Sequence, residues 1–205
     1  MLATRRWLGP RLVLMGIVLA GCGGNAPGSV PRDTSIGQSF AALLQTGIYI
    51  DYEVVESPAE LRDLADLVII GTISDVVEGR VLPYGRAEAQ ANLVIDVERV
   101  IRGIAPRSGP VYVEVTLPSG LLVSELASAA PNGRLVLFLG DRTYLRGTTG
   151  ETGRPEGSAI YAPFAQGMVI EADQMWISGL VDGEELPPGW QKLESFDQLV
   201  ATIED

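Results

Sequence analysis

Histidine is missing from this 205-residue sequence, cysteine occurs only at Cys22, and lysine occurs only at Lys192. Without histidine the chain forms neither a Ser-His-Asp nor a Cys-His catalytic arrangement, and it lacks the usual zinc ligand. Carboxylates, tyrosines and Lys192 are the groups left for general acid–base catalysis. With one thiol the chain cannot form an internal disulfide, so its own core must stabilise the fold.

Several catalytic and ligand-binding motifs are also absent. The sequence contains no G-x-S-x-G elbow, no S-x-x-K motif and no phosphate-binding G-K-S/T. Acidic residues gather at Asp51, Glu53 and Glu56 and in residues 182–185, but neither group has the spacing of a calcium loop. We interpret both as solvated turns and expect no metal and no cofactor.

The longest apolar stretch lies near the amino terminus and is too short to cross a membrane. Residues Leu12–Ala20 are largely apolar, whereas a transmembrane helix needs about 20 such residues. Arg5, Arg6 and Arg11 precede this stretch, and small residues follow it. This order is typical of an export signal. We therefore expect residues 1–21 to be a signal peptide.

The signal ends in Leu19-Ala20-Gly21-Cys22. This segment closely resembles the cleavage box of bacterial lipoproteins, in which the cysteine thiol receives a diacylglyceryl group and a peptidase then cuts before it. The resemblance implies that Cys22 becomes the lipidated first residue, anchored on the extracytoplasmic side of the bacterial cell membrane. Two or more acyl chains hold a protein there stably, at about 0.8 kcal/mol per buried CH2. The alternative is an ordinary signal peptide, or an uncleaved anchor, with an incidental cysteine.

The charge balance excludes one class of partner. Three of the 15 basic residues and none of the 26 acidic ones lie within residues 1–21, so the rest of the chain has a net charge of −14. Proteins bind nucleic acid and anionic lipid surfaces through clustered Lys and Arg. We therefore expect no nucleic-acid partner, and contact with the membrane through the lipid anchor.

The remaining chain divides into a spacer and one domain. Residues 22–38 are rich in glycine, proline and small polar residues, which predicts a flexible spacer. Residues 39–205 have a length that suits a single domain. Helices are predicted over Ser39–Gln45, from Ser57 onward and over Ser195–Ile203. The last two begin with capping-box sequences, and the Ser57 helix is expected to bury Leu61, Leu64 and Ala65.

Apolar patterns predict that most of the domain is β-structure. The predicted strands are residues 47–56, 66–79, 92–102, 111–117, 134–140, 159–164, 167–173 and 174–178. In residues 111–117 the alternation places Tyr112, Glu114 and Thr116 on the outer face. Gly71 interrupts its strand, which indicates a bulge. Residues 141–157 form a long glycine-rich loop.

Four of these segments follow a recognisable order: "ADLVIIGTISDV", "LVIDVERVIRG", "VYVEVTL" and "RLVLFL". The order, which spans about Leu61 to Gly140, resembles the oligonucleotide/oligosaccharide-binding (OB) barrel of netrin-like and metalloproteinase-inhibitor-like domains and of many bacterial surface proteins. It implies a mostly β fold, a small OB-like, partly closed β-barrel with a few peripheral helices; a β-sandwich is the alternative. Those inhibitors chelate zinc through a cysteine-rich amino terminus. Cys22 is the only cysteine here, so no functional residue is carried over.

Aromatic residues are the remaining candidates for ligand contact. Trp190, Tyr144 and Tyr161 are candidates for lining a carbohydrate or peptide groove. Trp190 lies in "LPPGWQ", where prolines and a glycine predict an exposed position. Trp176 is expected to pack in the core or in a hairpin.

The sequence favours a lipid-anchored protein that acts as a non-enzymatic binding or assembly module, with an envelope protein or glycan of unknown identity as its partner. A carboxylate-based envelope hydrolase is a second hypothesis, since paired carboxylates at a fixed separation hydrolyse glycosidic bonds. A peptide- or protease-binding, inhibitor-like domain is a third.

Overall fold

The computed structural model describes residues 34–46, 53–81, 89–145, 153–173 and 175–205. The chain separates into two units, Met1–Val30 and Pro31–Asp205. The export signal, the cleavage box and Cys22 lie outside the described residues, and the following paragraphs concern the second unit. In the described part of the chain, no helix is long and apolar enough to cross a membrane.

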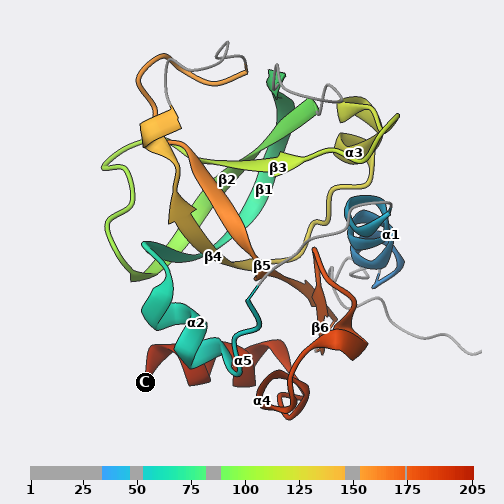
Figure 1. Cartoon of the computed structure of the whole chain (residues 1–205), viewed down its shortest axis with the longest axis vertical. Coiled ribbons are helices and arrows are strands. Elements are labelled where there is room, and N and C mark those ends of the chain that lie inside the picture. The colour runs from blue at the N-terminus through green and yellow to red at the C-terminus, as the bar shows by residue number, and fades with distance from the viewer. Residues whose placement is uncertain (1–33, 47–52, 82–88, 146–152, 174) are drawn as a thin grey trace, which may run out of the picture. The chain divides into compact units, whose positions relative to one another are not determined.

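Six strands form a single sheet in the order β3-β2-β1-β4-β5-β6 (Figure 1). Their bounds are β1 Leu67–Val81, β2 Ala89–Arg102, β3 Val111–Thr116, β4 Leu135–Asp141, β5 Tyr161–Ala172 and β6 Met175–Ser178. Neighbouring strands pair antiparallel, and one parallel pairing, Val113 with Tyr161, joins β3 to β5. Five strands therefore close into a ring of hydrogen bonds. The domain is mostly β, with a small, partly closed, OB-like barrel, as the sequence predicts.

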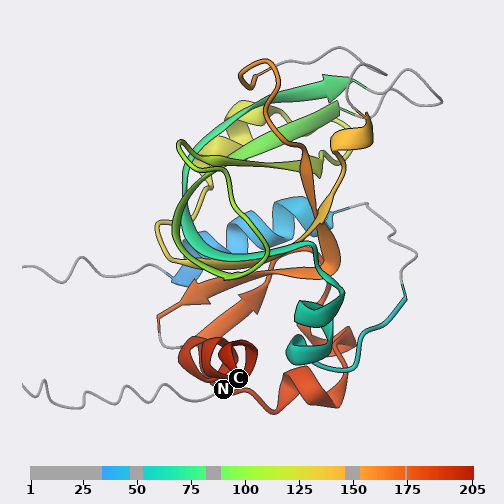
Figure 2. The same cartoon turned by 90° about the vertical axis from the view of Figure 1, so that its left-hand side faces the viewer.

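The helices are short and lie around this sheet. They are α1 Thr34–Gln45, α2 Pro58–Leu64, α3 Val123–Ser128, α4 Pro188–Gln191 and α5 Phe196–Glu204, with 3-10 turns η1 Thr143–Leu145 and η2 Gly183–Glu185. Figure 2 shows α1 crossing beneath the curved strands, next to the β5–β6 hairpin. Figure 1 shows α2, α4 and α5 grouped together at one end of the domain.

Both faces of the sheet are covered around β1 and β4, which explains why β4 is apolar throughout. Leu135, Leu137 and Leu139 point into the ring, where they join a core that includes residues of α1 and α3. Val136 and Phe138 point the other way, into a second core formed with α2, α4 and α5. Alternate residues of one strand thus belong to two different cores.

The predicted helix caps of α2 and α5 are confirmed. The Ser57 hydroxyl accepts a hydrogen bond from the Glu60 amide at 3.3 Å, and the Ser195 hydroxyl accepts one from the Gln198 amide at 3.2 Å. The apolar stripe of α5 is buried as expected. On α2, however, Leu61 is buried while Leu64 is exposed, because the seven-residue helix ends there and its covered side faces α5.

Arg134 attaches α5 to the sheet. Its Nη2 donates to Glu171 Oε1 at 2.9 Å and to Asp197 Oδ1 at 3.3 Å, and its guanidinium lies 4.9 Å from the centre of the Phe196 ring. The hydrogen bond with Glu171 raises the pKa of Arg134 despite its partial burial. The bidentate contact thus joins Arg134 to Glu171 of β5, and one hydrogen bond to Asp197 and the Phe196 ring link the same guanidinium to the first turn of α5.

Glycines mark the irregular positions of the strands. The β1–β2 register shifts between Ile70 and Gly71, as the predicted bulge requires, and the carbonyl of Asp96 occupies the space that a side chain at Gly71 would need. The two strands predicted in residues 159–173 form one strand, β5, with a register irregularity opposite Leu137–Leu139. The strand predicted over residues 174–178 is confirmed from Met175 onward, as β6, and it pairs antiparallel with β5.

The strand predicted over residues 47–56 is wrong in its described part. Residues 53–56 form no strand, and Val55 is buried whereas Val54 is exposed. The backbone of Val55 is paired with a side chain instead of a neighbouring strand. Gln166 accepts from the Val55 amide at 2.7 Å and donates to its carbonyl at 3.1 Å. Residues 47–52 lie outside the described residues.

The amino-terminal helix is longer than predicted. It begins at Thr34, so residues 34–38, expected to belong to the spacer, are helical. Phe40, Ala41 and Leu44 are buried in the core within the ring. Packing of this apolar face stabilises a helix that local sequence alone would support weakly.

Candidate functional site

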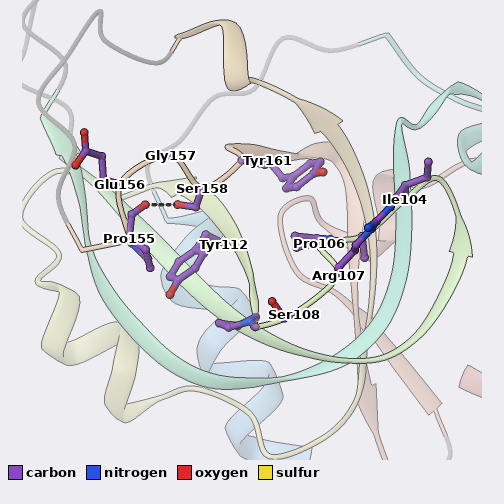
Figure 3. Close-up of a pocket in the computed structure, with 14 residues that line it drawn as sticks. Ile104, Pro106, Arg107, Ser108, Tyr112, Pro155, Glu156, Gly157, Ser158 and Tyr161 are labelled. Carbon is purple, nitrogen blue, oxygen red and sulfur yellow. Dashed lines mark hydrogen bonds between the residues drawn. The ribbon is translucent and has the colours of Figure 1, made fainter.

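A groove of about 650 Å³ lies where β3 meets β5 (Figure 3). One wall is the connection from β2 to β3, residues Gly103–Pro110, here called the strap. The opposite wall is residues Pro155–Ala159, and Tyr112 of β3 and Tyr161 of β5 lie between them. A concave, mostly apolar site with a few converging polar groups is the usual form of a ligand-binding site.

The strap is held by very few interactions. Gly103 turns the chain at φ +81° beside the carbonyl of Asp66, and Gly109 also has a positive φ. Pro106 and Pro110 lack an amide hydrogen and cannot join a strand ladder. Within the described residues, none of the strap's backbone groups has a hydrogen-bond partner. The strap is therefore an exposed segment whose amides and carbonyls are unpaired among the residues that the structure describes.

The strap also leaves part of β2 without a second neighbour. Among the described residues, β2 pairs with β3 over Gln90–Ile95 only, so Asp96–Arg102 pair with β1 alone. A second cavity of about 480 Å³ separates this free edge from the strap. Asp96 and Glu98 line it from β2, and Arg107 lines both cavities.

The two tyrosines differ in exposure and role. Tyr161 is 8 % exposed and belongs to the apolar core, while Tyr112 is half-buried. Figure 3 shows the Tyr161 hydroxyl directed toward the side on which the strap lies. Burial, followed by the negative charges of Asp141 and Asp66, raises the pKa of Tyr161. Its phenol therefore stays protonated, and available as a hydrogen-bond donor, beyond the normal titration range of tyrosine.

Two carboxylates lie near Tyr161, although neither of them lines the groove. Asp141 is the direct cross-strand partner of Tyr161, so the two side chains share one face of the sheet. The Asp66 carboxylate accepts a hydrogen bond from the Asp141 amide at 2.8 Å. The Asp141 carboxylate in turn accepts a hydrogen bond from the Thr143 amide at 2.7 Å. Two hydrogen-bonded carboxylates, both on exposed residues, thus lie near the phenol.

The far wall of the groove is anchored by a buried charged cluster. Arg80 Nε donates to Glu114 Oε2 at 2.7 Å and Arg80 Nη2 donates to Glu114 Oε1. Arg154, next to Pro155 of the wall, has a side chain 1 % exposed, and its Nη1 lies 3.9 Å from Glu114 Oε2. Glu114 was predicted to face solvent; that prediction is wrong, because Arg80 and Arg154 cover it.

Carboxylates are sparse in the groove itself. Among its lining residues Glu156 is the only one with a carboxylate. Asp96 and Glu98 line the second cavity, but they lie two residues apart on one strand and project from one side. In the described part of the chain, no three Asp, Glu, His or Cys side chains are grouped as metal ligands.

The acidic turns seen in the sequence lie elsewhere. Glu53 and Glu56 are exposed, and Asp51 is outside the described residues. The Asp182 carboxylate caps η2 by accepting a hydrogen bond from the Glu184 amide at 3.0 Å, and Asp182, Glu184 and Glu185 are all exposed. No described residue of either group lines the groove.

The three aromatic residues predicted as ligand contacts lie in different environments in the structure. Tyr161 lines the groove, whereas Tyr144 in η1 is exposed and its hydroxyl accepts from Arg142 at 3.1 Å. Trp190, predicted to be exposed, is fully buried: its indole donates to the Val55 carbonyl at 3.0 Å and its ring meets Phe138 edge to face. The adjoining prolines start α4 and turn Trp190 inward, so it makes no ligand contact at the surface.

No protein-family model matches the chain, and no curated protein matches it significantly.

One feature of the sequence indicates the groove, although it was not used in assigning the strands: the length of the connection between residues 102 and 111. "GIAPRSGP" separates two antiparallel strands by eight residues, whereas hairpin loops usually have two to five. A long connection of this kind is often a binding loop. Tyr112 gave no such signal, since its pattern matches any outward position of a strand.

Proposed function

We propose that this protein is a lipid-anchored extracytoplasmic binding module whose partner docks in the groove between the strap and residues 155–159. The groove is the observation that carries the binding role: it combines a large open cavity, free backbone groups and a protonated phenol. The proposed extracytoplasmic, lipid-anchored location is supported by the sequence Leu19-Ala20-Gly21-Cys22 and by the export signal that precedes it.

The other two hypotheses have less support. A glycoside hydrolase places two carboxylates on opposite sides of the scissile bond, while the groove lining contains only Glu156. A metalloproteinase inhibitor of the resembling family needs amino-terminal cysteines to chelate zinc, and Cys22 is the one cysteine in the sequence. The binding role requires neither arrangement.

The proposed lipid anchor is tested by replacing Cys22. We expect the native protein and a Gly24→Ala control to enter the detergent phase and to begin at Cys22 with the mass of a diacylglyceryl group. The Cys22→Ala variant should move to the aqueous phase. Retention of Cys22→Ala in the membrane, or a free thiol at Cys22, would contradict the proposal.

The binding role is tested in the intact envelope. A photo-crosslinking amino acid in place of Arg107, on the strap, is compared with one in place of Ser119, which is exposed and outside the groove. We expect discrete adducts from position 107 only. Equal labelling at both positions would contradict a docking site in the groove.

A further inference from the structure

The free backbone of the strap indicates the form of the ligand. Ile104, Ala105 and Arg107–Gly109 keep their amide hydrogens, and all strap carbonyls are available within the described residues. Extended peptides dock on such backbone through main-chain hydrogen bonds, with pockets for alternate side chains providing specificity. Cavities on both sides of the strap supply such pockets.

Exposed apolar surface at the entrance of the groove also favours an extended peptide as the ligand. Ile104 is 86 % exposed at the rim of the groove, and Val100 is 41 % exposed beside the second cavity. Prolines 106, 110 and 155 line the walls. An aliphatic side chain of a docked peptide would cover this surface and remove it from water.

Charges beside the groove select among peptides, since within its lining Glu156 and Arg107 carry opposite charges. At the Tyr161 end, Asp141 shares the face of the phenol and Asp66 is hydrogen-bonded to the Asp141 amide. Arg142, which follows β4, donates to the hydroxyl of Tyr144. Arg107 also lines the second cavity, with Asp96 and Glu98. The Tyr161 end is therefore suited to a cationic side chain.

The same geometry disfavours a glycan. Sugars bind protein aromatic residues on an open ring face, but Tyr161 is packed into the core and only Tyr112 presents part of its ring. An extended chain needs only the polar edge of Tyr161. The observations therefore favour a peptide over a carbohydrate.

We propose that the groove binds an extended segment of a partner protein and places one Lys or Arg side chain at the Tyr161–Asp141 end. This inference rests on the proposed function as a binding module and specifies its ligand. The amides and carbonyls of the strap's non-proline residues bond to the peptide backbone, and Asp141 and Asp66 attract the cation. The net negative charge of the whole chain favours the approach of such a segment.

The test uses the full-length protein in detergent and fluorescent peptides. The probe is an acetylated, amidated heptapeptide of threonine and valine with a central lysine; its matched control has glutamine at that position. We expect the lysine peptide to bind about fivefold more tightly, the ratio that about 1 kcal/mol from a partly exposed ion pair provides. This comparison needs no protein variant, so it is independent of any folding defect.

Protein variants locate the site. The isosteric double variant Asp66→Asn/Asp141→Asn should reduce the preference for lysine to less than about twofold, while Glu185→Gln, an exposed carboxylate elsewhere, preserves it. Ser108→Trp fills the space beside the strap and should abolish binding of both peptides. Ser119→Trp is its control outside the groove.

Four results would overturn the inference. They are no binding of either peptide up to about 1 mM, which corresponds to roughly −4 kcal/mol; equal binding of the two peptides; binding unaffected by Ser108→Trp; and groove-dependent binding of chitotetraose in place of the peptide. If crosslinking at position 107 succeeds while both peptides fail, the proposed binding role stands and the peptide ligand is wrong. If Cys22→Ala stays in the membrane while the lysine peptide binds, only the lipid address is wrong.

Discussion

Strand β4 and the strap are the two extremes of this domain. Leu135–Leu139 are fully buried, with one core on each face of the strand and a hydrogen-bonded neighbour on each edge. The strap runs beside a strand edge yet forms no backbone hydrogen bond within the described residues. Stability is therefore concentrated around β4, which leaves the strap free to form interactions with a partner.

The largest expected effect is on the core that β4 shares with the carboxyl-terminal helices. Trp190→Ala removes a buried ring packed on Phe138 and Trp176 and leaves the Val55 carbonyl with one donor fewer. We expect the free energy of unfolding to fall by about 3–5 kcal/mol, measured by urea denaturation. Trp176→Ala, at a half-buried site, should cost less. Equal losses would contradict the assignment of Trp190 to the core.

A buried ion pair is the next most sensitive point, because it lies between the core and the groove wall. Glu114→Ala removes the carboxylate to which Arg80 donates two hydrogen bonds. Breaking a buried pair costs about 3 kcal/mol or more, and chemical denaturation measures it. Glu171→Ala breaks a pair whose arginine is 30 % exposed, and should cost about half as much. A smaller loss for Glu114→Ala than for Glu171→Ala would refute this ranking.

Substitutions in the strap should have little effect on the free energy of unfolding. We expect Ser108→Ala to change the unfolding free energy by less than about 0.5 kcal/mol, whereas Val136→Ala in β4 costs about 2–3 kcal/mol. Hydrogen exchange followed by mass spectrometry should show rapid exchange of the strap amides and slow exchange in β4. Strap amides protected as strongly as those of β4 would show that the strap is a stable part of the fold.

The smallest effect concerns Tyr161 and appears only in alkali. Its pKa is raised by burial and by the charges of Asp141 and Asp66, so above the unfolded value of about 10 the unfolded chain loses a proton that the folded protein retains. Stability must then fall as pH rises from about 10 toward the folded pKa. Tyr161→Phe should lessen that fall, whereas Tyr144→Phe, at an exposed site, should preserve it. An unchanged pH profile for Tyr161→Phe would contradict the raised pKa.

Much of the fold is predictable because its signals are local. Alternation in residues 111–117 and the apolar run of β4 give their strands directly, and Ser57 and Ser195 mark two helix starts. Each signal depends on residues a few positions apart. The prediction failed at Val55 and Trp190, where partners more than a hundred residues away in the sequence determine the conformation.

The groove was predicted only in part. Tyr161 was a candidate from its residue type, but its partners across the sheet and the strap come together through pairings that span the whole domain. Glu114 was predicted to face solvent because the alternation of apolar residues takes no account of other segments that pack on the strand. Arg80 and Arg154, distant in sequence, are what bury it.

The sequence by itself determined the absence of histidine chemistry, the net negative charge and the mostly β architecture, since these depend on composition and on short-range periodicity. It also contains the cleavage-box pattern at Cys22, from which the proposed lipid anchor follows. Only the tertiary structure decided that Trp190 is buried, that Glu114 is paired and that the strap and Tyr161 enclose one cavity. These features arise from contacts between distant segments, and such contacts are fixed by the packing of the whole domain.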